Sequence, residues 1–310
     1  MTAPVNGLHH VTAIASNAQA NLDFWTGTLG LRLVKKTVNF DDPGTYHLYY
    51  GDALGRPGTA MTFFPWEHLQ QGRPGSGEAS LTLFSVPPGS LDFWRQRLGG
   101  SPSLDGGMSE AFGEKRLIVA DPDGTRLALV EREDAREGWT TDAIGTDVAI
   151  RGFHGVALTL RETGSTEALL TGLLGYRTEA REGSVTRLRA EGTEGARIVD
   201  LIEAPGLATG SQGAGSVHHV AFSTPDDESQ RAVQVLLAGN GFAVTPVIDR
   251  DYFNAIYFRS PGGVLFEVAT EEPGFAIDED PEALGTALKL PRQHEPLRAR
   301  IEAVLPPLFL

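Results

Sequence analysis

The chain repeats one pattern of predicted secondary structure four times, and this repeat limits its fold more than any other feature of the sequence. Each repeat opens with an extended segment, continues through an amphipathic helix, and ends in extended segments rich in β-branched and aromatic residues. The repeats span residues 5–67, 78–133, 151–205 and 215–270, and residues 271–310 form a C-terminal tail. Each repeat therefore predicts a βαβββ module.

A single βαβββ module would leave one apolar face of a curved sheet without a partner. We therefore expect the modules to pair and to close around shared interiors. The length of 310 residues also suits about two domains. The sequence predicts an α+β fold in which four βαβββ modules are paired into two open β-barrels.

Composition excludes several classes of site and partner. The chain has no cysteine, so disulfides, iron–sulfur clusters and a cysteine nucleophile are excluded, and a metal would need histidine or carboxylate ligands. The formal net charge is -14 without a cluster of Lys or Arg, so we expect no nucleic acid and no membrane as partners. Because neither a transmembrane run nor a secretory signal is visible, we expect a cytoplasmic protein.

Three repeats open with similar segments that contain histidine, namely GLHHVTAI, GFHGVALT and SVHHVAFS. We expect His10, His154 and His219 to occupy one position in these repeats, where the second repeat has Leu81 or Thr82. A lone histidine on a strand is usually a hydrogen-bonded or solvent-facing residue. Its recurrence at the start of equivalent strands favours a shared site instead.

The closing segments of the repeats supply candidate carboxylates. Glu267 lies in GGVLFEVAT of the fourth repeat, and we expect it to correspond to Glu131 in GTRLALVE of the second. In the third repeat its counterpart is, more loosely, Asp200 or Glu203. Because a carboxylate in an apolar stretch is costly to bury unless it is paired or bound to a metal, Glu267 is a candidate metal ligand.

Two histidine pairs are candidates for the remaining ligands. Successive strand residues point to opposite faces, so we expect that the two neighbours of a pair cannot both point into one interior. Periodicity alone leaves the choice open between His9 and His10, and between His218 and His219. One histidine of each pair with Glu267 would form a two-histidine, one-carboxylate set with open coordination positions. Such a set suits Fe(II), with Mn(II) and Zn(II) as alternatives.

The segment VIDRDYFNAIYFRSPGGVLFE adds polar groups that would suit a phenolic substrate. Tyr257 lies ten residues before Glu267, in even register, and could share its face. Arg250, Tyr252 and Tyr257 are therefore candidate binding residues. His154 has two interpretations: it supports or performs acid–base chemistry in the same cavity, or it is a buried histidine bonded to nearby backbone.

Several segments resemble one enzyme family in the same order over about residues 5–290. They are LHHVTAI, YHLYYGDALGRPGTAMTFFPW, RGFHGVALTL, HHVAF, YFRSPGGVLFEVAT and the tail segment GFAIDEDPEALGTALKLP. The chain resembles the ring-cleaving dioxygenases of the vicinal oxygen chelate superfamily, which also contains glyoxalases and bleomycin-resistance proteins. Within this family it is most similar to hydroquinone dioxygenases such as the 2,6-dichlorohydroquinone 1,2-dioxygenases.

The resemblance implies roles for individual residues. It implies that iron is held by His10, His219 and Glu267, the second histidine of each pair and the glutamate of GGVLFE. It also implies that modules 1 and 4 form the metal-bearing barrel and that modules 2 and 3 form the second barrel. The implied catalytic residues are His9, His154, His218, Arg250 and Tyr257, and the implied substrate-binding residues are Arg250, Tyr252 and Tyr257.

The implied activity is an Fe(II)-dependent, extradiol-type cleavage of a dihydroxylated aromatic ring, with hydroquinones expected rather than catechols. Its partners would be a small aromatic substrate and O2. The alternatives are a glyoxalase-type metal-dependent isomerase or lyase and a metal-free protein that binds small molecules. A glyoxalase-type site usually needs a further carboxylate, and the first repeat ends in AMTFFPW without one. The sequence leaves open the exact substrate, the cleavage position, the metal, and the choice between a monomer and a homo-oligomer.

Overall fold

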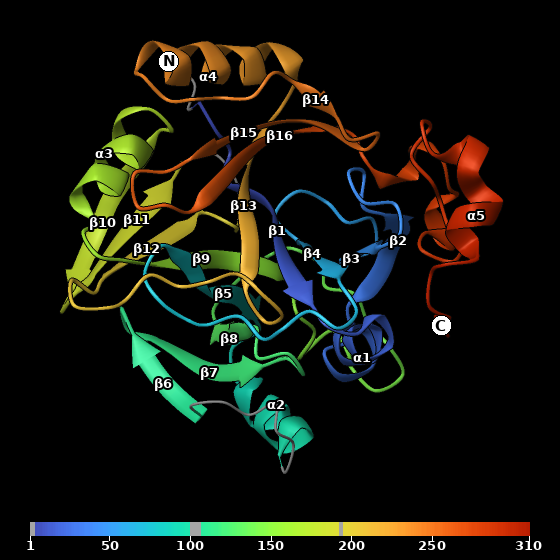
Figure 1. The fold of residues 1–310 in the computed structure, drawn as a ribbon. Coiled ribbons are helices and arrows are strands. Elements are labelled where there is room, and N and C mark those ends of the chain that lie inside the picture. Colours follow the sequence, from blue (N-terminus) through green and yellow to red (C-terminus); the bar gives the residue numbers. More distant parts are fainter. Residues whose placement is uncertain (1–3, 100–106, 192–194) are drawn as a thin grey trace.

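A computed structural model of the chain describes residues 4–99, 107–191 and 195–310. The described residues form two curved, open sheets of eight strands each, with few helices (Figure 1). The predicted α+β fold of four paired βαβββ modules is therefore confirmed.

Each module follows the predicted order of elements. The first contains β1 (Leu8–Ala15), α1 (Ala18–Leu22), the π-helical segment η1 (Asp23–Thr28), β2 (Arg32–Val38), β3 (Tyr46–Gly51) and β4 (Ala60–Pro65). The second contains β5 (Glu78–Val86), α2 (Leu91–Leu98), β6 (Gly107–Ala111), β7 (Glu114–Ala120) and β8 (Arg126–Glu131). The third contains β9 (Gly152–Leu160), α3 (Gly164–Gly172), β10 (Tyr176–Glu182), β11 (Val185–Ala190) and β12 (Ile198–Glu203). The fourth contains β13 (Val217–Thr224), α4 (Asp227–Gly239), β14 (Ile248–Asp249), β15 (Phe253–Arg259) and β16 (Leu265–Pro273).

The strand order shows which modules share a sheet. The first sheet has the order β14-β15-β16-β13-β1-β4-β3-β2, and the second has the order β10-β11-β12-β9-β5-β8-β7-β6. Two modules meet through antiparallel opening strands, β1 with β13 and β5 with β9. Each opening strand also pairs in parallel with the closing strand of its own module. The opening and closing strands of two modules therefore lie side by side at the centre of each sheet.

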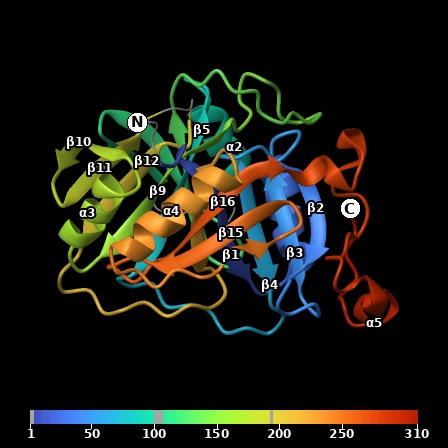
Figure 2. The same ribbon diagram turned by 90° about the horizontal axis from the view of Figure 1, so that it is seen from above.

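Aromatic side chains join the two sheets, which lie next to each other (Figure 2). The ring centroids of Trp25 in η1 and Phe84 in β5 are 5.9 Å apart, as are those of Tyr176 in β10 and Phe222 in β13. Trp25 and Phe84 have no exposed surface. Because burying a large apolar side chain contributes roughly 1.5–3 kcal/mol, these contacts hold the halves of the molecule together.

The first helix ends within the segment NLDFWTGTLGLRLV, whose last residues belong to a strand. The helical turns end at Thr28, Gly30 adopts a φ of 71°, and Arg32 already belongs to β2. A glycine in the left-handed region ends a helix without the steric cost of a Cβ atom, so the chain reverses there into the strand. None of the described helices is long and apolar enough to cross a membrane.

The C-terminal tail covers the edge of the first sheet at β2. It contains the short helical segments η2 (Phe275–Ile277), η3 (Pro281–Ala283), η4 (Glu295–Leu297) and α5 (Arg298–Glu302). An isolated parallel bridge joins Leu288 to Lys36, and the fully buried Lys35 forms an ion pair with Asp278 at 2.6 Å. The tail therefore protects an edge strand that would otherwise be open to pairing with another chain.

A β-bulge lies at the same place in all four opening strands. The register of β1 against β13 skips His9 on one strand and His218 on the other. In the second sheet, the register of β5 against β9 skips Ser80 and His154. An extra residue of this kind breaks the alternation of side chains and redirects its neighbours.

This register corrects the expected correspondence among the histidines. His154 is equivalent to the bulged residues His9 and His218, and not to His10 and His219. At the positions of His10 and His219, the third module has a glycine and the second has a leucine. The second sheet therefore lacks both histidines of the expected ligand set.

The closing strands also show which residues correspond to Glu267, which pairs with Ala221. At the same register, the counterparts are Thr62 in the first module, Ala128 in the second and Asp200 in the third. The expected correspondence with Glu131 is wrong. Glu131 lies further along its strand, where it accepts a hydrogen bond from the Leu91 backbone at the start of α2.

Candidate metal centre

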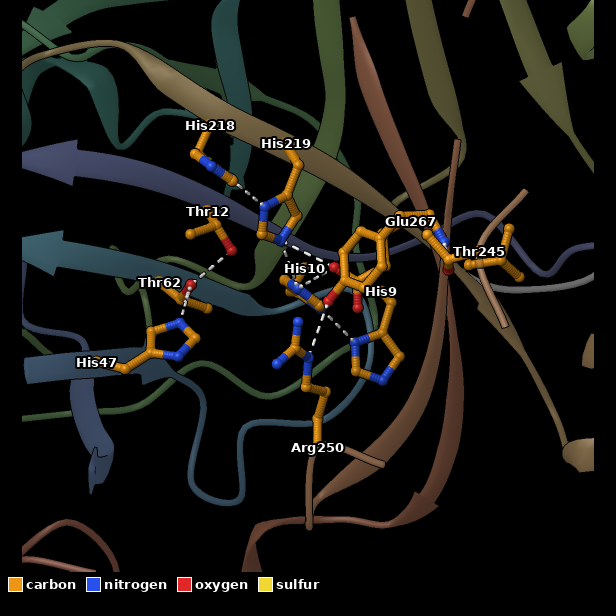
Figure 3. A network of polar contacts seen from close by, with 12 residues as sticks. His9, His10, Thr12, His47, Thr62, His218, His219, Thr245, Arg250 and Glu267 are labelled. Carbon is orange, nitrogen blue, oxygen red and sulfur yellow. Dashed lines mark hydrogen bonds and ion pairs between the residues drawn. The ribbon is translucent and has the colours of Figure 1, made fainter. Parts of the chain in front are cut away.

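Three buried side chains from neighbouring strands converge at the centre of the first sheet (Figure 3). His10 comes from β1, His219 from β13 and Glu267 from β16. Glu267 Oε2 lies 2.9 Å from His219 Nε2 and 3.4 Å from His10 Nε2. The two imidazole nitrogens are 3.3 Å apart. The side chains are at most 5% exposed, so three donor atoms face one another away from solvent.

These three donor atoms are better suited to coordinating a metal ion than to forming hydrogen bonds with one another. No described residue donates a well-formed hydrogen bond to either carboxylate oxygen of Glu267, although this side chain is fully buried. Burial raises the pKa of Glu267, but the imidazoles of His10 and His219 bring it well below its ordinary value, which keeps the carboxylate ionised. Donor atoms within 4.8 Å of one another, two from imidazoles and one from a carboxylate, could hold a divalent cation.

His9 fixes the tautomer of His10. His9 Nε2 lies 3.1 Å from the carbonyl oxygen of Thr270, so this nitrogen carries the hydrogen and donates it. Burial lowers the pKa of His9 to about 3, so the ring is neutral and its Nδ1 is an acceptor. His9 Nδ1 lies 2.9 Å from His10 Nδ1, which must therefore be the donor. His10 Nε2 is left without a hydrogen and free to coordinate a metal.

His218 makes the equivalent contact with His219, since their Nδ1 atoms are 2.8 Å apart. Burial lowers the pKa of His218 to about 3, so this ring is also neutral. Both histidines line one pocket, so the expectation that neighbours cannot point into one interior is wrong for this pair. The bulge at His218 is the physical reason, because it breaks the alternation on which that expectation rested.

The pocket beside the three ligands has a volume of about 380 Å³. Its aromatic wall consists of Phe40, Tyr49, Phe64, Trp66, Phe253 and Tyr257. Its other polar lining residues, apart from the three ligands, are Asn39, Asp41, Asp42, His47, His218 and Arg250. Aromatic walls with a few placed polar groups are typical of sites for small, flat organic molecules.

Arg250 and Tyr257 form the polar wall beside Glu267. Tyr257 pairs with Glu267 across β15 and β16, and Arg250 Nε donates a hydrogen bond to the Tyr257 hydroxyl at 3.3 Å. Arg250 also forms an ion pair with the exposed Asp41 at 3.3 Å and lies over the ring of Phe40. Burial raises the pKa of Tyr257 above its ordinary value, so its hydroxyl stays protonated. Both residues line the pocket, and their contact with substrate stays a prediction.

Tyr252 and His154 do not line this pocket. The Tyr252 hydroxyl donates to Asp278 of the tail at 3.2 Å, and Lys35 Nζ lies 4.8 Å from the centre of its ring. His154 lies in the second sheet, where its Nε2 is 3.0 Å from Glu114. These positions do not support the substrate contact expected of Tyr252 or the acid–base role expected of His154 at the metal ligands.

An ion-pair network in the second sheet stands where the first sheet has its ligands. Asp200, the counterpart of Glu267, accepts a hydrogen bond from Arg187 at 2.8 Å. Arg187 also donates to Glu114 at 2.6 Å, which joins His154 to the same network. The second sheet therefore neutralises its buried carboxylate with a guanidinium group.

Apart from His10, the pocket residues of the first module were not found from the sequence, and His47, Tyr49 and the neighbouring Thr62 are examples. His47 and Tyr49 line the pocket from β3, and Thr62 on β4 lies behind His47. The spacing of two in YHLYY places His47 and Tyr49 on one face of a strand, so strand alternation could have found them. Their link to Thr62 depends on the pairing of β3 with β4, which the sequence does not show.

Comparisons with known sequences identify the family of the chain. A profile of the Glyoxalase/Bleomycin resistance protein/Dioxygenase superfamily matches residues 7–89 and 85–268. The protein named "Putative ring-cleaving dioxygenase MhqO" from Bacillus subtilis strain 168 is 46% identical over 308 residues, which cover 99% of this chain and 98% of that protein. Chlorohydroquinone/hydroquinone 1,2-dioxygenase from Sphingobium indicum is 36% identical over 303 residues, which cover 94% of this chain and 93% of that enzyme.

Solved structures show the same fold over most of the chain. A crystal structure from Bacillus subtilis superposes with a TM-score of 0.95 at 46% identity and covers 98% of each chain. Glyoxalase I from Zea mays superposes with a TM-score of 0.63 at 14% identity, covering 86% of this chain and 92% of the other. At that identity, the second likeness shows the fold alone.

Proposed function

Because the chain belongs to the Glyoxalase/Bleomycin resistance protein/Dioxygenase superfamily, we propose that it is an Fe(II)-dependent, extradiol-type ring-cleaving dioxygenase. The proposed substrates are dihydroxylated aromatic rings, hydroquinones rather than catechols, and the co-substrate is O2. The observation that carries the proposal is the convergence of His10, His219 and Glu267 beside a pocket with an aromatic wall. The name of the Sphingobium relative supports the choice of hydroquinones.

The donor set supports Fe(II) as the metal. Two imidazoles and one carboxylate leave open coordination positions, and this combination is characteristic of non-haem Fe(II) oxygenases. When bound, Fe(II) would supply the redox chemistry that couples the ring to O2. Mn(II) and Zn(II) are the alternatives that a metal analysis must separate from it.

The pocket residues would bind and orient the ring. The Tyr257 hydroxyl and the Arg250 guanidinium lie beside Glu267, where they can hydrogen-bond the substrate oxygen nearest the ligands. If His219 coordinates through Nε2, its Nδ1 donates to His218, and His218 can then donate from its own Nε2 toward a ligand. His9 would act on the site only by orienting His10. The aromatic wall would pack against the ring and exclude water.

A glyoxalase-type activity is less well supported by the first module. A further carboxylate ligand would have to lie at the counterpart of Glu267, and Thr62 stands there. The Thr62 hydroxyl is already engaged with His47 at 2.9 Å and with Thr12 at 2.8 Å. Among the described residues, the first sheet therefore offers three protein ligands rather than four, which suits a reaction that needs open metal positions.

The proposed partners are a small aromatic molecule and O2, and the proposed location is the cytoplasm. A net charge of -14 disfavours anionic surfaces such as nucleic acid and acidic lipid. A small neutral phenol carries no charge that this field would repel.

The test is aerobic turnover of hydroquinone by protein that has been loaded with Fe(II) in the absence of O2. We expect O2 uptake at an electrode together with a ring-opened product whose mass includes both oxygen atoms. Catechol tests the ring preference, and Zn(II)-loaded protein controls for binding without redox chemistry. Uptake of O2 without a ring-opened product would contradict the proposal, and isomerisation of a glutathione hemithioacetal would favour the glyoxalase alternative.

A further inference from the structure

A second tyrosine, Tyr49, is the counterpart of Tyr257 in the first sheet. Tyr257 pairs with Glu267 across β15 and β16, and Tyr49 pairs with Thr62 across β3 and β4. Because Thr62 is the counterpart of Glu267, the two tyrosines occupy equivalent positions in the fourth and first modules. Both line the pocket, so the pocket presents a related tyrosine from each of its two modules.

Each tyrosine hydroxyl is held by a nitrogen-containing side chain of its own module. Arg250 lies 3.3 Å from the Tyr257 hydroxyl, and His47 Nδ1 lies 2.8 Å from the Tyr49 hydroxyl. The ring centroid of His47 is 4.0 Å from that of Tyr49 and 4.3 Å from that of Phe64. His47 is thereby fixed by ring contacts as well as by its hydrogen bonds.

A line of hydrogen bonds continues from His47 into the sheet (Figure 3). His47 Nε2 lies 2.9 Å from Thr62 Oγ1, which lies 2.8 Å from Thr12 Oγ1. Thr12 and Thr62 have no exposed surface, and His47 is buried. Buried polar side chains are costly unless they are hydrogen-bonded, and a connected network of them favours one arrangement. The line therefore holds the His47 ring in place behind Tyr49.

Of His47 and Tyr49, it is Tyr49 whose hydroxyl can still form a hydrogen bond with a ligand. Both ring nitrogens of His47 are engaged, so its imidazole has no free hydrogen-bonding atom. The Tyr49 hydroxyl uses one hydrogen-bonding position for His47 and retains others, because a phenol can both donate and accept. Burial raises the pKa of Tyr49 well above its ordinary value, so it remains a hydroxyl.

We propose that Tyr49 is a second substrate anchor, which binds the hydroxyl group of the dihydroxylated ring that lies away from the metal ligands. His47 and Thr62 are positioning residues that act through Tyr49. This inference rests on the proposed function. Tyr257 stands beside the carboxylate ligand and serves the near oxygen, whereas Tyr49 stands beside a threonine that takes the ligand's place. The two tyrosines together would select a ring with two hydroxyl groups over a ring with one.

The test compares the binding of hydroquinone with that of 4-methylphenol, in which a methyl group replaces one hydroxyl. Each is titrated calorimetrically into Fe(II)-loaded protein without O2, so that no turnover is needed. We expect Tyr49→Phe to weaken hydroquinone binding about fivefold, the effect of one hydrogen bond, and to leave 4-methylphenol unchanged. Thr62→Val should act in the same direction, about two- to threefold, because it loosens His47.

Thr37→Val is the matched control. Thr37 pairs with His47 on the neighbouring strand β2, is fully buried, and has a hydroxyl without a hydrogen-bond partner among the described residues. It should therefore leave both affinities unchanged. If Tyr49→Phe does not fold, as judged by circular dichroism, the ratio of the two affinities in Thr62→Val decides the question.

Two outcomes are distinguishable. Equal affinities of the unaltered protein for the two ligands, or equal weakening of both by Tyr49→Phe or Thr62→Val, would overturn the anchor and leave the proposed function intact. Failure of the metal-loaded, unaltered protein to bind either ligand would overturn the proposed function itself.

Discussion

Replacing Glu267 by glutamine tests whether the three converging side chains hold a metal. The amide is close to the carboxylate in size but carries no charge, and the position is fully buried. The assay is the shift in Tm that Fe(II) causes in calorimetry without O2. It is compared between the unaltered protein and Glu267→Gln. Comparing shifts removes any effect that the substitution has on the metal-free fold.

The magnitude follows from linkage between binding and unfolding. A ligand at 100 times its Kd stabilises the folded state by about 2.7 kcal/mol. For a chain of 310 residues, that corresponds to a rise in Tm of roughly 4 °C. Loss of one of three ligands should weaken binding at least about 100-fold, since even residues behind metal ligands account for 10- to 100-fold. At the same Fe(II) concentration, the Tm of the variant should then rise by less than about 1 °C.

Glu131→Gln is the matched control, because Glu131 is also a glutamate of a closing strand but contacts the start of α2 instead. It should keep the full metal-dependent shift. Metal content, measured by mass spectrometry after gel filtration, should follow the calorimetry. A Glu267→Gln protein that retained both the shift and the metal would refute the assignment of this cluster as the metal centre.

Three further predictions concern the histidines and the core. His10→Ala and His219→Ala should each abolish iron retention. His9→Ala should weaken iron binding about 10- to 100-fold, because it removes the acceptor that fixes the His10 tautomer. Unchanged iron content in His9→Ala would contradict this. The free energy of unfolding of metal-free protein should fall as the pH falls from 6.5 to about 3. His9 and His218 stay neutral in the folded state over this range, while unfolded histidines bind protons. A midpoint of urea unfolding that is constant over this range would argue against this prediction. Trp25→Ala should lower the free energy of unfolding by roughly 3–5 kcal/mol, because its side chain is fully buried between the sheets; a loss below about 1 kcal/mol in urea unfolding would show that those contacts do little.

The fold could be predicted because the local sequence pattern indicates the order of strands and helices in each repeat. Four repeats of strand, helix and strands require pairing for burial, and the Gly-rich turns and apolar runs mark where each element ends. Family resemblance pointed to His10, His219 and Glu267, and the structure brings these three together. That they bind iron stays a prediction for the experiments above.

Two correspondences predicted from the sequence, those of His154 and Glu131, are wrong. His154 was aligned with the ligand histidines, but it is the bulged residue of its strand. Glu131 was matched to Glu267 by its place near a strand end, although parallel pairing puts an alanine there. Tyr252 lies near the candidate residues in sequence, yet its hydroxyl turns to the tail. The ungapped alignment of GLHHVTAI with GFHGVALT already places His154 at the position of His9. The pairing of the closing strands and the contact between Tyr252 and the tail, in contrast, are not contained in a local pattern.

The repeat and its apolar periodicity were enough to predict four modules and their closure in pairs, because burial of each module's open face is a requirement that every copy carries in its own residues. The ligand cluster needed more. His10 and His219 lie 209 positions apart in the chain, and they meet because β1 and β13 pair antiparallel. The bulge at His218 then lets His218 and His219 both face the pocket, and the pairing of β3 with β4 sets Tyr49 beside Thr62. Contacts of this kind are properties of the assembled sheet, since no single strand holds both partners.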